Sequence, residues 1–385
     1  MLAIVACLTI AQGRTAKTLT PESLRATVEK LASWRTRNTS SSELNEVADW
    51  LAGEYRKIPG MQVEIMRYQI RKGPRIPADK DVVEVVATLP PNKPEQPGIV
   101  LMGGHIDTIN MGRGEDPMTA RAPGANDDGS GSAATLDVAR FLADKPRSHT
   151  LVFAGFSGEE QGLLGSEALA ARAEREGWRV DAVLSNDMIG NSHNLAGQVD
   201  DRHVRLFSEE SPKHNSRELG RWIEWLNRTK GDRRFGVKLV FRPDRFGRGG
   251  DHTPFNRHGF NAIRLVEMHE EYSRQHTPND LPDAMDFDYL ARNAKLNALA
   301  VETLANAGLA PSGVRVDRRQ NHDTMLTWRT TPGTRYMVYW RDTTEPTWTH
   351  WKEVGDVGQI EFKMLSKDEN VFAVGAVGGV PIEAK

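Results

Sequence analysis

Hydrophobic and polar positions follow two periods along this chain, that of helices and that of strands. From about Pro21 to Ile58, apolar residues recur every three or four positions, which is the spacing of amphipathic helices. Short apolar runs then alternate with further helical stretches. We predict the following runs as strands: Val82 to Leu89, Ile99 to Gly103, Leu151 to Phe156, Ala182 to Leu184 and Ala262 to Val266. Such alternation predicts an α/β fold in which a sheet is layered with helices.

The pattern changes after the stretch from Tyr289 to Ala307, which we predict to be a helix that ends before Gly308 and Pro311. From Gly313 onward, apolar or alternating segments such as Tyr336 to Trp340 stand between turn-like clusters. This pattern predicts a small all-β sandwich. We therefore divide the chain into a leader over residues 1–13, an α/β domain over 14–308 and a β-sandwich over 309–385.

Composition excludes some classes of partner. The chain carries 50 basic and 52 acidic residues, so its formal net charge of -2 favours neither nucleic acid nor anionic lipid. After the leader, no segment is apolar enough over sufficient length to span a membrane. Nothing in the sequence indicates an oligomeric state.

The first thirteen residues, MLAIVACLTIAQG, form an apolar run that ends in small residues. This is typical of a secretory signal peptide, so we expect a secreted or periplasmic protein, with a buried N-terminal segment as the alternative. Residues Ile4 to Cys7 faintly resemble a lipoprotein processing box, although export without lipid is favoured. Because Cys7 is the only cysteine, a metal in the mature protein must be held by nitrogen and oxygen ligands.

Candidate chemistry begins where the strand at Ile99 ends. His105 and Asp107 lie there, at the edge of the sheet where open α/β folds place their ligands. As an isolated pair they would more often be packing or surface residues. A metal-binding imidazole, however, needs a partner on its far nitrogen, and Asp107 can supply that carboxylate.

Two pairs of adjacent acids follow. Asp127 and Asp128 lie in a glycine-rich turn that opens a helix, and Glu159 and Glu160 follow the strand that ends at Phe156. Helix capping explains one acid of a pair more readily than two. Adjacent acids point in different directions, so Glu160 can bind metal while Glu159 takes a proton from the attacking water.

Asp187 and His276 complete the candidate ligands, one at a strand end and the other in a loop. His105, Asp127 and Asp187 can surround one cation, while Asp127, Glu160 and His276 surround a second. Two zinc ions would then lie about 3.5–4 Å apart, a spacing suited to hydrolysis.

Five motifs in this order resemble metallopeptidase family 28, which contains aminopeptidases and glutamate carboxypeptidases. They are His-x-Asp, Asn-Asp-Asp-Gly-Ser-Gly, Gly-Glu-Glu-x-Gly-Leu-Leu-Gly-Ser, Asn-Asp-Met and Gln-His-Thr-Pro-Asn-Asp, between Leu24 and Ala305. The resemblance implies a mixed-sheet phosphorylase/hydrolase-like domain, a bridging Asp127 and a cis peptide bond between Asp127 and Asp128. It also implies that Asp251 and His252 support the centre without binding metal. In the β-sandwich, the strands around Trp328 and Tyr336 resemble a fibronectin type III-like domain.

One position departs from the family pattern. Many aminopeptidases of this family carry tyrosine immediately before the last histidine, directed at the developing oxyanion, and Gln275 stands there in this chain. Glutamine can donate a hydrogen bond, but it has a different reach.

The resemblance implies an enzyme that removes N-terminal residues from peptides, with two Zn²⁺ ions as cofactors. A carboxypeptidase or another amide hydrolase is an alternative, favoured if Arg245 or Arg248 in the Arg- and His-rich stretch before Asp251 binds a substrate carboxylate. A solvated charged surface is the simpler interpretation of that stretch. A one-zinc glutaminyl cyclase and a catalytically inactive binding protein are further alternatives. The related family-20 peptidases are excluded because the spacing leaves no room for their lid domain.

Overall fold

The computed structural model describes residues 18–385 apart from residues 95–96, 113, 117, 212, 245–247 and 320–321. The predicted leader with Cys7, and also Arg245, therefore lie outside the described residues.

An eight-stranded mixed sheet forms the centre of the larger domain, in the order β1-β2-β4-β3-β5-β8-β6-β7. The four middle strands, β4, β3, β5 and β8, are parallel to one another. The strands span β1 (Gln62–Ile70), β2 (Lys80–Leu89), β3 (Ile99–His105), β4 (Thr150–Phe156), β5 (Val180–Asn186), β6 (His203–Phe207), β7 (Gly236–Val240) and β8 (Ala262–Glu267). All five predicted strands of this domain are present.

The Arg- and His-rich stretch before Asp251 differs from the expected charged surface of helices and loops. It contributes β6 and β7, which pair with each other and extend the sheet beyond β8. The alternating burial of β6, with Val204 and Leu206 buried, explains why it joins the sheet. Between these strands, helix α5 has one apolar face that the charged residues along the stretch obscured.

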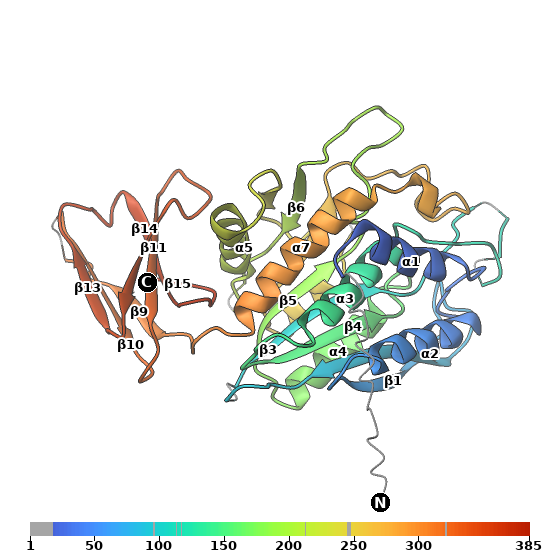
Figure 1. The fold of residues 1–385 in the computed structure, drawn as a ribbon, viewed down its shortest axis with the longest axis horizontal. Coiled ribbons are helices and arrows are strands. Elements are labelled where there is room, and N and C mark those ends of the chain that lie inside the picture. Colours follow the sequence, from blue (N-terminus) through green and yellow to red (C-terminus); the bar gives the residue numbers. More distant parts are fainter. Residues whose placement is uncertain are drawn as a thin grey trace, which may run out of the picture.

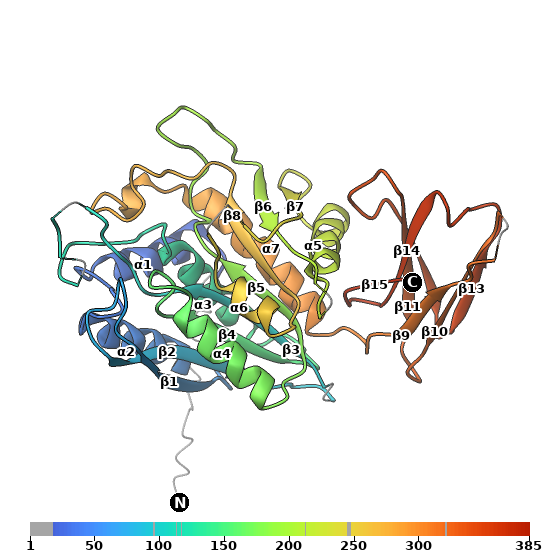
Figure 2. The ribbon, with the colours of Figure 1, turned by 180° about the vertical axis from the view of Figure 1, so that it is seen from behind.

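Helices cover both faces of the sheet (Figures 1 and 2). One face carries α1, α2, α3, α5 and α7, and the other carries α4 and α6. The helices span α1 (Pro21–Ala32), α2 (Glu43–Arg56), α3 (Gly129–Leu142), α4 (Leu164–Arg175), α5 (Ser216–Lys230), α6 (His252–Arg257) and α7 (Phe287–Leu304), with a short 3₁₀ helix η1 (Pro282–Ala284). Local signals fix the starts of two helices. Thr20 caps α1, whose first residue is Pro21, and Asp286 accepts from the Tyr289 amide at the start of α7.

The C-terminal residues form two antiparallel sheets, in the orders β13-β10-β9 and β12-β11-β14-β15. Their strands span β9 (Ser312–Val316), β10 (Thr324–Arg329), β11 (Tyr336–Asp342), β12 (His350–Gly355), β13 (Gln359–Phe362), β14 (Asn370–Ala376) and β15 (Ile382–Glu383). Side chains between the sheets, including Leu326, Trp328 and Val338, form a separate core. The expected all-β domain is thus confirmed.

An aromatic contact joins this domain to α5. Trp225 packs edge-on against Tyr339 with ring centroids 5.0 Å apart, and Trp348 is fully buried beside them. Arg221 and Arg228 of α5 donate to the carbonyls of Pro346 and Trp348 at 2.9 and 2.6 Å. The β-sandwich therefore packs against α5, away from the carboxyl ends of the central strands (Figure 1). Within the part of the chain that the structure describes, no helix combines the length and apolar character needed to cross a bilayer.

Candidate metal centre

The predicted ligands come together where the parallel middle strands end. His105 is the last residue of β3, Glu159 and Glu160 follow β4, and Asp187 follows β5. Because parallel strands present their carboxyl ends at one edge of a sheet, residues far apart in sequence become neighbours. His276, in the loop between β8 and η1, reaches the same place.

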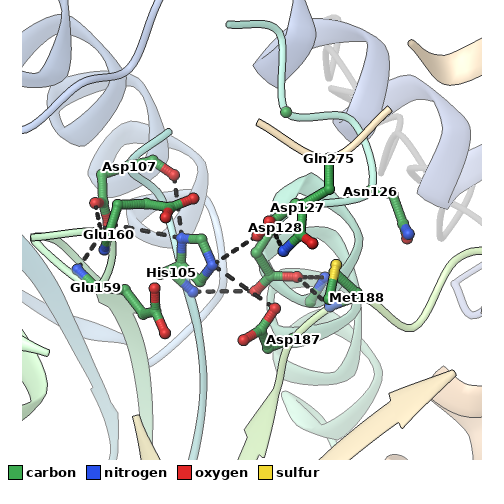
Figure 3. A network of polar contacts seen from close by, with 12 residues as sticks. His105, Asp107, Asn126, Asp127, Asp128, Glu159, Glu160, Asp187, Met188 and Gln275 are labelled. Atoms are coloured by element: carbon green, nitrogen blue, oxygen red, sulfur yellow. Dashed lines mark hydrogen bonds and ion pairs between the residues drawn. The ribbon is translucent and has the colours of Figure 1, made fainter. Parts of the chain in front are cut away.

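Asp127 lies between the two histidines, and Figure 3 shows its contact with His105. Its Oδ1 is 3.1 Å from His105 Nε2, and its Oδ2 is 3.1 Å from His276 Nε2. Asp187 Oδ1 is 3.8 Å from the same nitrogen of His105, while Glu160 Oε1 is 3.1 Å from that of His276. The five side chains thus form two groups that share one carboxylate.

These groups fit a metal ion. His105 Nε2, Glu160 Oε1 and Asp187 Oδ1 are buried without a hydrogen-bond partner in the described structure. Ligand atoms of His105, Asp127 and Glu160 also lie within 4.8 Å of one another. Orphaned buried nitrogen and oxygen atoms are costly unless a cation satisfies them, and this donor set suits zinc.

The charge balance leads to the same conclusion. Burial by itself lowers the pKa of His276, but the carboxylates of Asp127 and Glu160 outweigh it and raise this pKa to about 11. The pKa of His105 is also raised well above its ordinary value, because its three carboxylate neighbours outweigh burial. Positive charge is therefore strongly favoured between these carboxylates, and a metal ion supplies it while leaving the imidazoles neutral.

Glu159 is half-buried beside His105 (Figure 3). Burial, together with the negative charges of Asp187 and Glu160, raises the pKa of Glu159 well above its ordinary value. A carboxylate with a raised pKa next to a cation site is suited to take up and release a proton.

Asp107 braces both sides of the centre. Its Oδ1 lies 3.6 Å from His105 Nδ1, and the backbone amides of Glu159 and Glu160 each donate to its carboxylate at 3.2 Å. Thr39 donates a further hydrogen bond at 3.2 Å. His105 Nδ1 also lies 3.1 Å from the backbone carbonyl oxygen of Asp107. Asp107 therefore orients the imidazole mainly through this carbonyl, while its carboxylate fixes the loop that carries the two glutamates.

Asp128 contacts backbone amides and organises the glycine-rich turn. It caps α3 by accepting from the Gly131 amide at 2.8 Å, and it accepts from the amides of His105 and Met188 at 3.1 and 3.2 Å. A Cβ on Gly131 would lie 2.3 Å from the Asn186 carbonyl oxygen, so only glycine permits this approach. The Asp127–Asp128 peptide bond is cis, as the family resemblance implied.

Asp251 and His252 begin α6 and stand behind the centre. Burial raises the pKa of Asp251 to about 7, and burial together with Arg264 lowers that of His252 to about 4. Neither residue is among the carboxylates and histidines that form the two ligand groups. His252 lies near Arg264, the partner of Asp187, since a Cβ on Gly250 would come within 3.4 Å of atoms of both Arg264 and His252.

Gln275 contacts the shared carboxylate. Its Nε2 donates to Asp127 Oδ2 at 2.7 Å, so in this structure the amide is used to hold Asp127. Arg248 donates to Glu270 at 3.2 Å, an ion pair outside the ligand set.

Sequence reasoning missed several residues that hold the ligands. Arg264 contacts Asp187 Oδ2 at 2.8 Å and also pairs with Asp244. Asp280 accepts from the amides of Asn126 and Asp127, while Arg37 donates to carbonyls of the glycine-rich turn. The available signal was a charged residue at the centre of an otherwise apolar strand, which Arg264 is in β8.

Sequence comparison relates the chain to known peptidases. The profile of Peptidase family M28 matches residues 84–301, the range that holds all five predicted ligands. A probable zinc metalloprotease of Leptosphaeria maculans is 34% identical over 406 residues, covering 94% of this chain and 92% of that protein.

Solved structures share the fold at lower identity. BSAP, a zinc aminopeptidase from Bacillus subtilis, matches with a TM-score of 0.61 and 15% identity, over 75% of this chain and 96% of BSAP. The glutaminyl cyclase of Fimbriiglobus ruber matches with a TM-score of 0.55 and 17% identity, over 74% of this chain and 96% of the cyclase. The fold alone therefore does not choose between hydrolysis and cyclisation.

Proposed function

Since the chain belongs to peptidase family M28, we propose that it is a dizinc aminopeptidase, a metallo-exopeptidase that removes N-terminal residues from peptides. One observation carries the proposal of two metal ions. The two oxygens of Asp127 face two different histidines, and each histidine has its own second carboxylate, Asp187 or Glu160.

In this proposal, His105, Asp127 and Asp187 hold one zinc ion, and Asp127, Glu160 and His276 hold the other. Bound zinc would polarise the scissile carbonyl and make a bound water acidic enough to react near neutral pH. Asp107 keeps the His105 ring oriented, with Nε2 directed at the metal.

Glu159 is the proposed general base. It accepts a proton from the attacking water and then delivers it to the leaving amine. Its raised pKa supports this role, because the carboxyl group must hold the proton between the two steps. Gln275 is held by Asp127 and is proposed to position that carboxylate, in the place where tyrosine would face the oxyanion.

The experiment compares an unblocked tripeptide with its N-acetylated twin, with and without a zinc chelator. Chelator-sensitive release of the first residue from the unblocked peptide alone is expected. Cleavage of both peptides from the carboxyl end would show a carboxypeptidase instead, and cyclisation of N-terminal glutamine would show a glutaminyl cyclase. Metal analysis of the purified protein should give two zinc ions per chain.

The Glu159→Gln variant tests the general base. We expect kcat to fall at least about 100-fold, because glutamine cannot accept the proton. Zinc content should stay unchanged, since Glu159 is not a proposed ligand. Activity within a few-fold of the wild type would assign the base elsewhere.

Two further parts of the proposal concern the ends of the chain. We propose export to the periplasm or the medium, on the basis of the apolar leader, and fractionation of expressing cells tests it. The three-stranded and four-stranded sheets of the C-terminal domain support a fibronectin type III-like assignment.

A further inference from the structure

Arg75 lies at the tip of the loop between β1 and β2, next to the metal centre. The loop is well braced, because Gly73 and Ile76 exchange backbone hydrogen bonds of 2.9 and 3.1 Å and Ile76 is buried. Pro74 immediately before Arg75 further restricts the turn. Arg75 is therefore presented by a defined turn.

The guanidinium of Arg75 contacts the segment that carries the general base. Its Nη1 donates to the backbone carbonyl oxygen of Glu160 at 2.6 Å, and the residue is otherwise exposed. No carboxylate of the described residues lies within ion-pair distance of it, whereas Arg71 in the same loop pairs with Asp79 at 2.7 Å. Since a guanidinium has five N–H donors, most of those on Arg75 remain available to a ligand.

Other arginines near the centre are already engaged. Arg264 is buried against Asp187 and Asp244. Arg248 pairs with Glu270, and Arg37 is buried among backbone carbonyls. Arg75 thus differs from these three in combining exposure with direct contact to a ligand-bearing loop. Arg274, in the loop of His276, donates instead to the Ala284 carbonyl at 3.3 Å.

Arg75 lies on the side of the centre where the residue after the scissile bond is expected. In the proposed reaction, Glu159 delivers a proton to the leaving amine, so the residue after the scissile bond lies beside the Glu159–Glu160 loop. One residue spans about 3.5 Å of chain, so a carboxylate on that residue comes close to a group that contacts this loop. An arginine fork is well matched to a carboxylate.

We infer that Arg75 forms a subsite for a carboxylate on the residue that follows the scissile bond. This inference rests on the proposed function and narrows its substrate class. The carboxylate can be the α-carboxylate of a free dipeptide or the side chain of an acidic second residue. Peptides with neither group would bind without help from Arg75.

The test compares three substrates: Leu-Ala, Leu-Ala amide and Leu-Asp amide. The wild type should cleave Leu-Ala or Leu-Asp amide with a kcat/KM about tenfold or more above that of Leu-Ala amide, as expected for a charged hydrogen bond. Arg75→Met should remove this preference through KM, with kcat little changed and Leu-Ala amide affected less than about twofold. The larger fall in kcat/KM, for Leu-Ala or for Leu-Asp amide, identifies whether Arg75 binds the α-carboxylate or an acidic side chain.

Two matched variants and a binding measurement support the test. Arg71→Met removes a cation from the same loop and should keep the wild-type preference, while Arg75→Lys should keep only part of it. Equilibrium binding of Leu-Ala to the Glu159→Gln protein should weaken about tenfold when Arg75→Met is added.

The outcomes separate the inference from the function. Cleavage of Leu-Ala amide together with no preference for a carboxylate, or a preference that survives Arg75→Met, would overturn the inference and leave the aminopeptidase proposal standing. A wild-type enzyme that cleaves none of the three substrates would overturn both.

Discussion

The two halves of the metal centre are built differently. The strand half consists of His105 and Asp187, whose side chains are 1% and 3% exposed and lie at the ends of β3 and β5. The loop half consists of Glu160 and His276, and the His276 side chain is 28% exposed on a backbone with a φ of 58°. Both histidines nevertheless lie 3.1 Å from Asp127.

The difference lies in what holds each half. In the strand half, Arg264 pairs with Asp187 and Asp107 orients His105, so buried charges and sheet hydrogen bonds fix both ligands. In the loop half, His276 is tied mainly through its backbone, whose carbonyl accepts from Met111 at 2.9 Å. Glu160 is buried, and its amide donates to Asp107. We infer that folding builds the strand half and places Glu160, whereas metal binding contributes more to ordering His276.

The largest expected effect comes from removing the cation behind the strand half. Arg264→Met leaves Asp187 buried without its guanidinium partner, which should lower the unfolding free energy of the zinc-free protein by about 3–5 kcal/mol. Denaturant titration in the presence of a chelator measures this loss. Arg248→Met is the control, because its ion pair is partly exposed and Glu270 keeps a second partner in Arg205, so about 1 kcal/mol or less is expected.

Zinc should offset part of the Arg264→Met loss, since the metal ion also neutralises Asp187 and stabilises the state that binds it. Equal losses in the two arginine variants would mean that Arg264 is no more important to the strand half than an arginine outside the centre.

The next largest effect is expected from substituting each of the two histidines in turn. His105→Asn should destabilise the zinc-free protein by about 2–3 kcal/mol, because it removes a fully buried ring from a hydrogen-bonded network. His276→Asn should cost less than His105→Asn, since the 28% exposed side chain of His276 is screened by solvent and asparagine tolerates a positive φ. Activity should be lost in both. The comparison fails if the two unfolding free energies fall equally.

The strand half was also the easier one to predict. His105 and Asp187 follow apolar runs that mark strands, and the rule that sites lie at strand ends places such residues together. His276 lies in a loop with no periodic pattern, so only its motif resemblance indicated it. Four of the five predicted strands are the parallel middle strands, and they were predicted for the same reason, since buried parallel strands are continuous apolar runs.

Other features left no recognisable pattern in the sequence. Strands β6 and β7 alternate apolar with charged residues in a stretch dominated by arginine and histidine, and this charge obscured the period. Arg75 is an ordinary arginine in the sequence, and Arg264 is marked only by its place within an apolar run. Their importance comes from contacts with Glu160 and Asp187, each more than seventy positions away, which only the folded chain reveals.

The smallest expected effect concerns the pH dependence of the strand half. His252, packed near Arg264, is buried, and burial together with that arginine lowers its pKa from 6.5 to about 4. A histidine with a lowered folded-state pKa contributes stability that is fully present above pH 6.5 and is lost as the pH falls toward 4, because only the unfolded chain takes up the proton. Between pH 7.5 and pH 5, this amounts to about 2 kcal/mol at most.

His252→Gln removes the titrating group while keeping a donor that can reach the Pro243 carbonyl, which accepts from His252 Nε2 at 2.8 Å. The variant should therefore lose less stability than the wild type on acidification from pH 7.5 to pH 5. Denaturant midpoints are compared with chelator present at both pH values, so that protonation of the metal ligands does not appear as zinc release. Identical pH slopes in wild type and variant would show that His252 is already accessible to protons in the folded state, and that the support behind Arg264 is looser than its burial indicates.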